Sequence, residues 1–141
     1  MSGGHRFDPT ILREYDVRGV VGETLSAEDS RFLGRAFGTL ARRRGAAALA
    51  VGYDGRFTSP ELEAALVEGL AAAGPDVLRI GRGPTPMLSF ATCTQAVDGG
   101  IMVTGSHNPP AHNGFKMTLG GASFFGADIQ ELGRIAAAGD L

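Results

Sequence analysis

The stretch "AAALAVGYDGRFTSPELEAALVEGLAAAGPDVLRIG", from Ala46 to Gly81, decides the fold. Its first part, Ala46 to Asp54, is a short continuous apolar run, which is typical of a buried strand. In the following "TSP", Ser59 can cap a helix and Pro60 fits the first helical position. The apolar residues of that helix share one face and are Leu62, Leu66, Leu70 and Ala73. With "DVLRIG" as the next strand, the order predicts a right-handed crossover between parallel strands.

The same alternation precedes this stretch. "REYDVRGVV", from Arg13 to Val21, is expected to form a first strand. A helix then opens with Ser26 as its N-cap and Asp29 in its first turn, and it stops at Gly45. Its inward face is expected to hold Phe32, Leu33, Ala36, Phe37 and Leu40.

The alternation also continues after Gly81. "GRGPTP" is expected to be a stiff loop, Met87 to Gln95 a short helix, and "GGIMVTG" a buried strand. "SHNPPAHNG" then predicts a loop, "FKMTL" a further strand, and "ADIQELGRIAAAG" a last helix. The inward residues of that last helix are expected to be Ile129, Leu132 and Ile135.

This order of elements predicts an α/β fold with three layers, α/β/α, around a mainly parallel mixed sheet. The loop between "GIMV" and "FKMTL" is too short for a crossover, so we expect those two strands to pair antiparallel and to give the sheet one antiparallel edge strand. The 141 residues suffice for one domain, which we expect to span 1–141. The loops at the strand carboxyl ends should share one rim, the usual ligand side of such folds.

The composition is ordinary for a globular protein, with 43% hydrophobic and 20% charged residues and a net charge of −2. The one basic block, Arg42 to Arg44, closes a predicted helix, where cations suit the macrodipole, so nucleic acid is not an expected partner. No apolar run reaches the roughly 18 residues that span a bilayer, and the first residues lack a signal-peptide core. We therefore expect a cytoplasmic location without a membrane contact. Cys93 lies in a predicted helix and is expected to be a buried thiol.

The richest chemistry lies in "TGSHNPP", Thr104 to Pro110, directly after a buried strand. Ser106 stands where a nucleophilic hydroxyl would be both exposed and held by the scaffold. The nucleophile elbow of hydrolases needs a glycine two residues after its serine, and here that residue is Asn108, which argues against acyl transfer. A purely structural reading is a tight turn that the serine and asparagine stabilise and two prolines fix.

Three cationic or titratable side chains accompany that serine. His107 and Lys116 are candidate proton carriers, and Arg18 brings a permanent positive charge if the first strand joins the sheet nearby. Together with Ser106 they favour stabilisation of a phosphoryl group over attack on a carbonyl. Lys116 is the only lysine among 13 basic residues, either because its ammonium can be deprotonated or as a chance of an arginine-rich composition.

Taken together, "TGSHNPP", "NGFKM" and "REYDVRG" resemble the N-terminal domain of the α-D-phosphohexomutases, most closely the phosphomannomutase/phosphoglucomutase branch. "GYDGRFTSP" and "GPTPMLSFA" also resemble family segments, in the expected order. The resemblance implies an isomerase that acts as an intramolecular phosphotransferase and interconverts hexose 1-phosphate and hexose 6-phosphate of mannose or glucose. The implied reaction belongs to carbohydrate metabolism and passes through a phosphoserine and a bisphosphorylated sugar.

By the same resemblance, Ser106 is the phosphoryl carrier and one ligand of Mg²⁺, which neutralises the transferring group. His107 and Lys116 are the implied acid/base groups, Lys116 being the better candidate for moving the sugar hydroxyl proton, and Arg18 completes the catalytic set. The family position of Lys116 settles the question of the single lysine.

The remaining substrate-binding assignments rest on the resemblance too. Tyr15 and Arg18 are expected to line the phosphoserine and substrate cleft together with Ser106, His107 and Lys116, and Asn108 to shape the loop. Asp54 and Arg56 also match a family segment, but we expect them to form a packing contact or a supporting salt bridge.

The chain departs from the family in length, because family members have four domains. We therefore expect 1–141 to be the N-terminal, phosphoserine-bearing domain of a longer phosphohexomutase, inactive alone and partnered by the remaining domains, a hexose phosphate substrate and a glucose 1,6-bisphosphate-type activator. The other Mg²⁺ ligands would then lie outside this chain. The alternatives are a stand-alone phosphosugar-binding or regulatory module without turnover, and a purely structural α/β domain.

Overall fold

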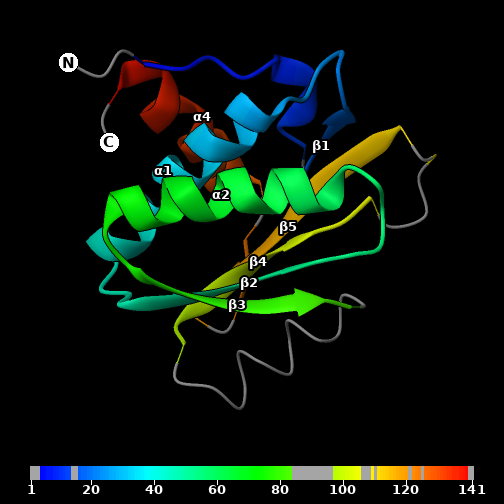
Figure 1. Cartoon of the computed structure of the whole chain (residues 1–141). Coiled ribbons are helices and arrows are strands. Elements are labelled where there is room, and N and C mark those ends of the chain that lie inside the picture. Colours follow the sequence, from blue (N-terminus) through cyan, green and yellow to red (C-terminus); the bar gives the residue numbers. More distant parts are fainter. Residues whose placement is uncertain are drawn as a thin grey trace.

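The computed structural model describes residues 4–13, 16–83, 97–105, 109, 111–120, 122–124 and 126–139. In Figure 1 the helices α1, α2 and α4 lie on one side of a mixed sheet. The strands are β1 (Val17–Val20), β2 (Ala48–Tyr53), β3 (Asp76–Arg82), β4 (Gly99–Val103), β5 (His112–Leu119) and β6 (Ala122–Ser123). The helices are the short 3₁₀ turn η1 (Pro9–Ile11), α1 (Ala27–Arg43), α2 (Ser59–Ala73) and α4 (Ala127–Ala138).

The sheet has the order β1-β5-β4-β2-β3, and β6 pairs with β5. As expected, β2 is parallel to both β3 and β4, and β5 is antiparallel to β4. The antiparallel side differs in one respect, because β1 adds itself outside β5 through the pairing of Val17–Val20 with His112–Phe115. Gly114 permits this pairing, since a Cβ at that position would lie 2.3 Å from the carbonyl oxygen of Val17.

The boundaries of β5 and β1 differ from the expectation, and β1 explains the difference at β5. β5 begins at His112 rather than Phe115, because β1 supplies partners for the residues that we expected in a loop. β1 itself is shorter than the predicted Arg13–Val21 and begins at Val17. Before it, the N–H of Arg13 donates to the carbonyl oxygen of Asp16, 3.0 Å away.

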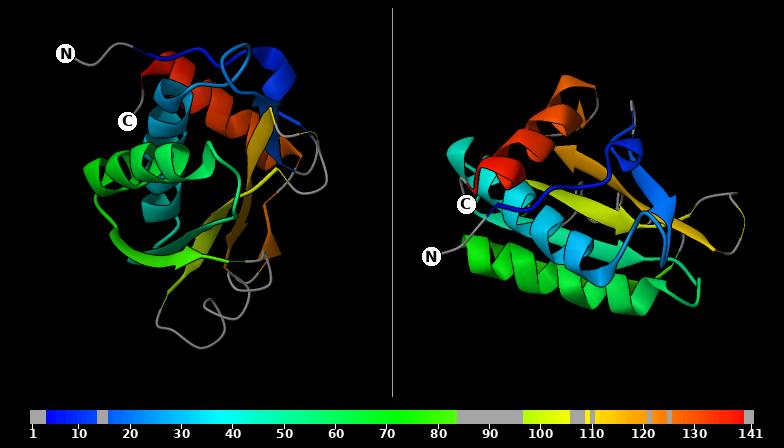
Figure 2. Two further views of the ribbon diagram at one scale, coloured as in Figure 1. Left: turned by 45° about the vertical axis from the view of Figure 1, so that its right-hand side comes forward. Right: turned by 90° about the horizontal axis from the view of Figure 1, so that it is seen from above.

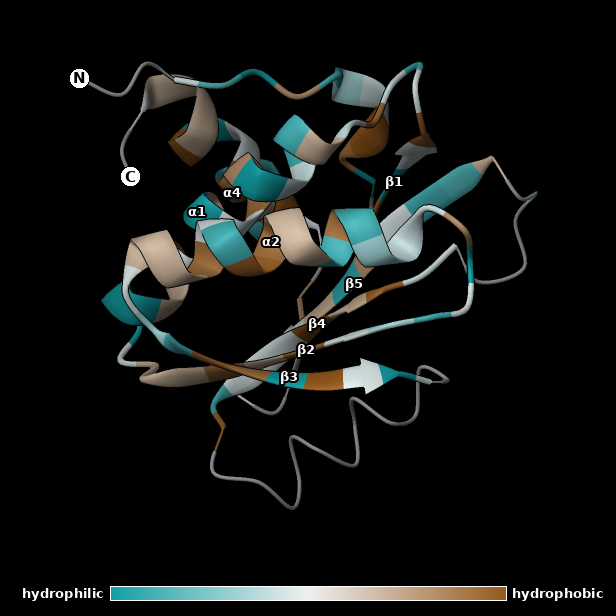
Figure 3. Ribbon diagram, in the orientation of Figure 1, coloured by the Kyte–Doolittle hydropathy of each residue, from teal (hydrophilic) through white to brown (hydrophobic). Residues whose placement is uncertain are grey.

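The central strands are buried on both faces. Leu49, Val51, Ile101 and Val103 pack into the main core with the helices, whereas the alternate residues Ala50 and Met102 form a smaller cluster with Ile80 and Val97. Side chains alternate between the two faces of a strand, so the smaller cluster lies on the face away from α1 and α2. Figure 3 shows that apolar residues predominate in these strands. Burial on both faces is the condition that a three-layer α/β/α fold imposes.

Helix α1 follows the predicted pattern closely. The Ser26 hydroxyl accepts a hydrogen bond from the N–H of Asp29, and the Asp29 carboxylate accepts from the N–H of Ser26, which completes a capping box. Four of the five predicted inward residues are buried, namely Leu33, Ala36, Phe37 and Leu40. Phe32 is only half-buried and stacks on the ring of His5, with 4.5 Å between centroids.

The start of helix α2 differs from the expectation. Its N-cap is Thr58, and Ser59 and Pro60 occupy the first two helical positions. Ser59 does not cap the helix because its hydroxyl donates to the carboxylate of Asp54, 2.5 Å away. The predicted inward residues Leu62, Leu66 and Leu70 are buried, and Ala73 is half-buried. In α4 the three predicted inward residues are all buried. The predicted helix Met87–Gln95, with Cys93, lies outside the described residues.

Helices α1 and α2 lie side by side, as both views in Figure 2 show, and their backbones approach closely. Gly34 and Gly69 make this approach possible: a Cβ on Gly34 would lie 2.4 Å from the carbonyl oxygen of Leu66, and one on Gly69 would lie 1.9 Å from that of Arg31. Neither contact is tolerable for a real side chain, so the pair of helices depends on both glycines. The main hydrophobic core beneath them is built from residues of this chain, so we expect the chain to fold on its own.

We predict that Gly69→Ala destabilises the protein by about 1–3 kcal/mol because the added methyl group overpacks the interface with α1. In an ordinary helix interior the same change stabilises by roughly 1 kcal/mol. Urea unfolding measures the sign, with Ala64→Gly at an exposed position of α2 as the control for helix propensity. A stabilised Gly69→Ala protein would contradict the close packing.

Candidate functional site

Three chain segments meet at the rim formed by the carboxyl ends of the parallel strands. Asp54 follows β2, Thr104 follows β4, and β5 starts at the same rim because it runs in the opposite direction. Backbone hydrogen bonds align these segments with one another. The N–H of Asp54 donates to the carbonyl oxygen of Val103 at 2.9 Å, and the N–H of Thr104 donates to the carbonyl oxygen of Gly114 at 2.9 Å. The segment 104–112, called the serine loop below, therefore leaves and re-enters the sheet at adjacent strands.

The carboxylate of Asp54 is the centre of this rim. One of its oxygens, Oδ2, accepts hydrogen bonds from the hydroxyl of Thr104 at 2.8 Å and from the N–H of Gly105 at 3.1 Å. The other oxygen, Oδ1, accepts from the hydroxyl of Ser59 at 2.5 Å and from the N–H of Arg56 at 3.1 Å. A single charged group thus joins the end of β2, the start of α2 and residues 104–105, which are called the first limb of the serine loop below.

Arg56 binds the other side of that loop at Pro109 and His112, which are called its second limb below. Its Nη1 donates to the carbonyl oxygen of Pro109 at 2.7 Å and to that of His112 at 3.1 Å. Its Nε lies 3.5 Å from the Asp54 carboxylate, which is the supporting salt bridge expected from the sequence. The guanidinium also lies against Gly105, where a Cβ would come within 2.2 Å of Nε. The glycine before the serine is therefore required by the arginine that packs over it.

Asn113 extends the network into the core. This side chain is fully buried, and its Nδ2 donates to the hydroxyls of Thr58 and Ser59, each at 2.9 Å. Its Oδ1 accepts from the N–H of Gly114 at 2.9 Å. Each polar atom of the amide has a partner, as buried polar groups require. Asn113 was not among the predicted site residues, although it begins the quoted "NGFKM".

The network also changes the acidity of its central carboxyl. Burial by itself raises the pKa of Asp54, but the hydrogen bonds from Ser59, Arg56, Thr104 and Gly105 outweigh it and bring the pKa below its ordinary value. These donors prefer the ionised form because a carboxylate accepts hydrogen bonds more strongly than a neutral acid. Asp54 is therefore a structural anion at neutral pH.

Arg18 lies on β1, level with the start of the serine loop, because Arg18 and Thr104 both neighbour Gly114 on β5. Its Nη2 and Nε donate to the carboxylate of Asp16 at 2.8 and 3.2 Å. Asp16 is 4% exposed and was missed by the sequence analysis. This buried acid fixes the guanidinium while leaving further N–H donors for a second anion.

Lys116 lies on β5, two residues after Gly114, the partner of Arg18, and opposite Met102 on β4. Its neighbours Phe115 and Met117 face the main core, so Lys116 points to the other face of the sheet, as Arg18 does beside the core residue Val17. Lys116 is half-buried, and it forms no hydrogen bond or ion pair with any described residue. A lysine without a partner among the described residues, on the same sheet face as a fixed arginine, makes this face suited to an anionic ligand.

The predicted site residues are thus described in part. Arg18 and Lys116 lie on one sheet face. Tyr15, Ser106, His107 and Asn108 lie outside the described residues, so their roles stay predictions.

The described ranges contain no group of three or more histidine, cysteine, aspartate or glutamate side chains that could hold a metal ion. The acid nearest to the serine loop, Asp54, has both oxygens engaged by its own chain. The described residues therefore do not form a Mg²⁺ site by themselves. No helix in this part of the chain is long and apolar enough to cross a membrane.

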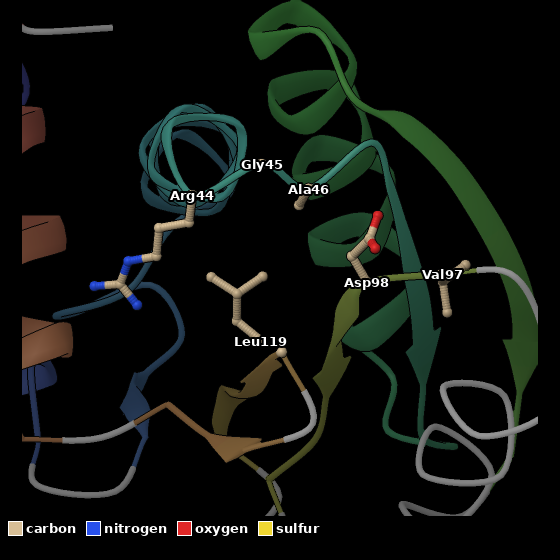
Figure 4. Close-up of a pocket in the computed structure, with 7 residues that line it drawn as sticks. Arg44, Gly45, Ala46, Val97, Asp98 and Leu119 are labelled. Carbon is tan, nitrogen blue, oxygen red and sulfur yellow. The ribbon is translucent and has the colours of Figure 1, made fainter.

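A pocket of about 400 Å³ lies at the opposite end of the sheet and is shown in Figure 4. Its charged groups serve the fold. Asp98 accepts hydrogen bonds from the N–H groups of Ala47 and Ala48, which lower the pKa of its carboxyl, and Arg44 forms an ion pair with Asp128 at 3.1 Å. This pocket is remote from the serine loop and offers no free charge for a ligand among its described residues.

Sheet order and helix placement define an open α/β domain, and comparison with known proteins gives its family. Residues 9–141 match the family model described as "Phosphoglucomutase/phosphomannomutase, alpha/beta/alpha domain I". The chain therefore belongs to this family, which confirms both the resemblance seen in the sequence and the three-layer class of the fold.

Individual relatives agree. The chain is 48% identical over 122 residues to a phosphoglucomutase of Neisseria gonorrhoeae and 46% identical over 123 residues to a phosphomannomutase/phosphoglucomutase of Pseudomonas aeruginosa. These matches cover 86% and 87% of the chain but only 26% and 27% of the relatives. A solved family protein from Burkholderia thailandensis superposes with a TM-score of 0.91 at 45% identity, covering 96% of this chain and 31% of that one. The chain thus spans about a quarter to a third of its relatives.

We predict that Asp54→Asn lowers the free energy of unfolding at neutral pH by about 1–3 kcal/mol, because the amide nitrogen cannot accept the hydrogen bonds that one carboxylate oxygen accepts. The pKa of Asp54 is lowered in the folded state, so its contribution is fully present above the ordinary value of 3.8 and is lost as the pH falls through the folded-state value. Urea unfolding at pH 7 and at pH 3 should show the two proteins converging in acid. A constant difference would contradict the network.

Proposed function

We propose that this chain is the N-terminal, serine-bearing domain of a longer phosphohexomutase that interconverts the 1- and 6-phosphates of mannose or glucose. The observation that supports it most is the placement of Arg18 and Lys116. Both lie on one sheet face beside the start of the serine loop, and Lys116 has no partner among the described residues. Family membership and the length of the relatives are consistent with this role.

In the proposed reaction Ser106 is carried as a phosphoserine. A hydroxyl oxygen of the hexose monophosphate attacks the phosphorus, the bond from phosphorus to the serine oxygen breaks, and a bisphosphorylated sugar forms. The sugar then turns over and presents its other phosphate, which returns to Ser106. Serine oxygen and sugar oxygen exchange one phosphoryl group in each half-reaction, so no net phosphate is consumed.

The chain's own residues supply binding and proton transfer. Lys116, in its deprotonated amine form, takes the proton of the attacking hydroxyl, and a proton returns to the released oxygen of Ser106; a lysine can lose its proton for this role, whereas a guanidinium cannot. Arg18, fixed by Asp16, binds the phosphate of substrate or phosphoserine through its remaining N–H donors. His107 is the second acid/base group, and Tyr15 and Asn108 contact the substrate and shape the loop.

Mg²⁺ would neutralise charge on the transferring phosphoryl group, with Ser106 giving one ligand and the rest of the polypeptide the others. A glucose 1,6-bisphosphate-type activator would load the serine initially. The isolated 141-residue chain should therefore be inactive, and the remaining domains are its partners. A cytoplasmic location stays a prediction.

We predict that Ser106→Ala abolishes mutase turnover in the longer polypeptide. Lys116→Arg, which keeps the charge but cannot be deprotonated, should lower kcat by about 10²–10⁴-fold. Steady-state kinetics with glucose 1-phosphate and mannose 1-phosphate measure both, and Arg134→Lys on the exposed side of α4 is the matched control.

Unchanged turnover in either variant would refute the role assigned to that residue. If the unmodified longer polypeptide lacks activity while the 141-residue chain binds hexose phosphates saturably without Mg²⁺, the chain is a binding module instead.

A further inference from the structure

We propose that Asp54 and Arg56 are the positioning residues of the serine loop, and that Arg56 couples its two limbs into one rigid unit. This inference rests on the proposed function for its effect on turnover, but its structural part is independent of it. Neither side chain needs to touch the substrate. Their action is on the backbone at both sides of 106–108.

The first limb is fixed next to the proposed phosphoryl carrier. Asp54 binds the hydroxyl of Thr104 and the N–H of Gly105, so the last backbone amide before residue 106 is anchored to a charge. Hydrogen bonds to an ionised acceptor are roughly twice as strong as neutral ones. Asp54 is itself held by the start of α2, a rigid element, through Ser59.

The second limb is fixed by the same short segment. Arg56 donates from one nitrogen to the carbonyl oxygens of Pro109 and His112, which lie on the far side of 106–108. Its guanidinium also packs on Gly105 of the first limb and lies 3.5 Å from Asp54. The two limbs therefore share one side chain, and a displacement of Arg56 must disturb both.

Such a coupling has a direct consequence for transfer chemistry. A reacting atom misplaced by about 1 Å can lower a rate about 10²-fold, even when the mutation lies away from the chemistry. A pair that touches loop backbone and no substrate should affect kcat and leave KM nearly unchanged. A residue that only stabilises the fold would lower the amount of active protein without a specific effect on the serine loop.

Replacing Arg56 by lysine separates these readings. Arg56→Lys keeps the positive charge, but an ammonium lacks the planar fork that lies over Gly105 while Nη1 reaches two carbonyl oxygens. We expect about a 10–100-fold loss of kcat in the longer polypeptide with KM within about 2-fold. The matched control is Arg42→Lys, because Arg42 also donates to a backbone carbonyl, that of Ala73, at a site remote from the loop.

A double-mutant cycle tests the coupling in the 141-residue chain, without any activity. Gly105→Ala places a methyl group where the Arg56 guanidinium lies, so it should accelerate amide hydrogen exchange of His112, whose carbonyl binds Arg56, as well as that of Thr104 and Gly105. Arg56→Ala should do the same. Since the smaller side chain removes the clash, adding Gly105→Ala to Arg56→Ala should change exchange little further, a clear departure from additivity.

The outcomes separate the two proposals. Non-additive exchange at both limbs supports the coupling even if the longer polypeptide shows no mutase activity, in which case the proposed function alone fails. Additive effects, or exchange altered only on the first limb, overturn the coupling. Equal kinetic effects of Arg56→Lys and Arg42→Lys in an active mutase overturn the positioning role.

Discussion

The ionised carboxylate of Asp54 is the interaction on which the rest of the rim depends. It binds four donors from the end of β2, the start of α2 and the first limb of the serine loop. Because these donors hold its pKa low, the group stays charged at neutral pH and the network stays closed. Arg56 adds the second limb. Asp54, placed directly after a buried strand, and Arg56 therefore hold the described backbone on both sides of 106–108.

The sequence predicts the regular elements well where local periodicity decides them. The apolar face of α4 follows from such a pattern, the N-cap of α1 from the residue type at Ser26, and the antiparallel pairing of β4 with β5 from the short loop between them. Tertiary contacts explain the differences. Ser59 has the chemistry of an N-cap, but its hydroxyl binds Asp54, and Thr58 takes the cap position. The place of β1 outside β5 depends on a close approach at Gly114, which no local pattern encodes.

The candidate site was likewise predictable only where residue type alone indicates the chemistry. Arg18 and Lys116 were predicted from chemistry and resemblance, and strand register places them on one face. The acids and amides that support them could not be ranked in advance: Asp16 and Asn113 gain their roles only from partners that folding brings together. A useful signal was nonetheless present in "GYDGRFTSP", where an acid and an arginine follow a buried strand at the ligand side of the sheet.

The central claim, that this domain carries the phosphoryl group on Ser106, is tested most directly by mass spectrometry of the longer polypeptide after incubation with glucose 1,6-bisphosphate and Mg²⁺. The account predicts one added phosphoryl group, on the peptide that contains Ser106, and its loss when hexose monophosphate is then added in excess. An active mutase that bears no phosphate on Ser106, or bears it on another residue, would contradict the account.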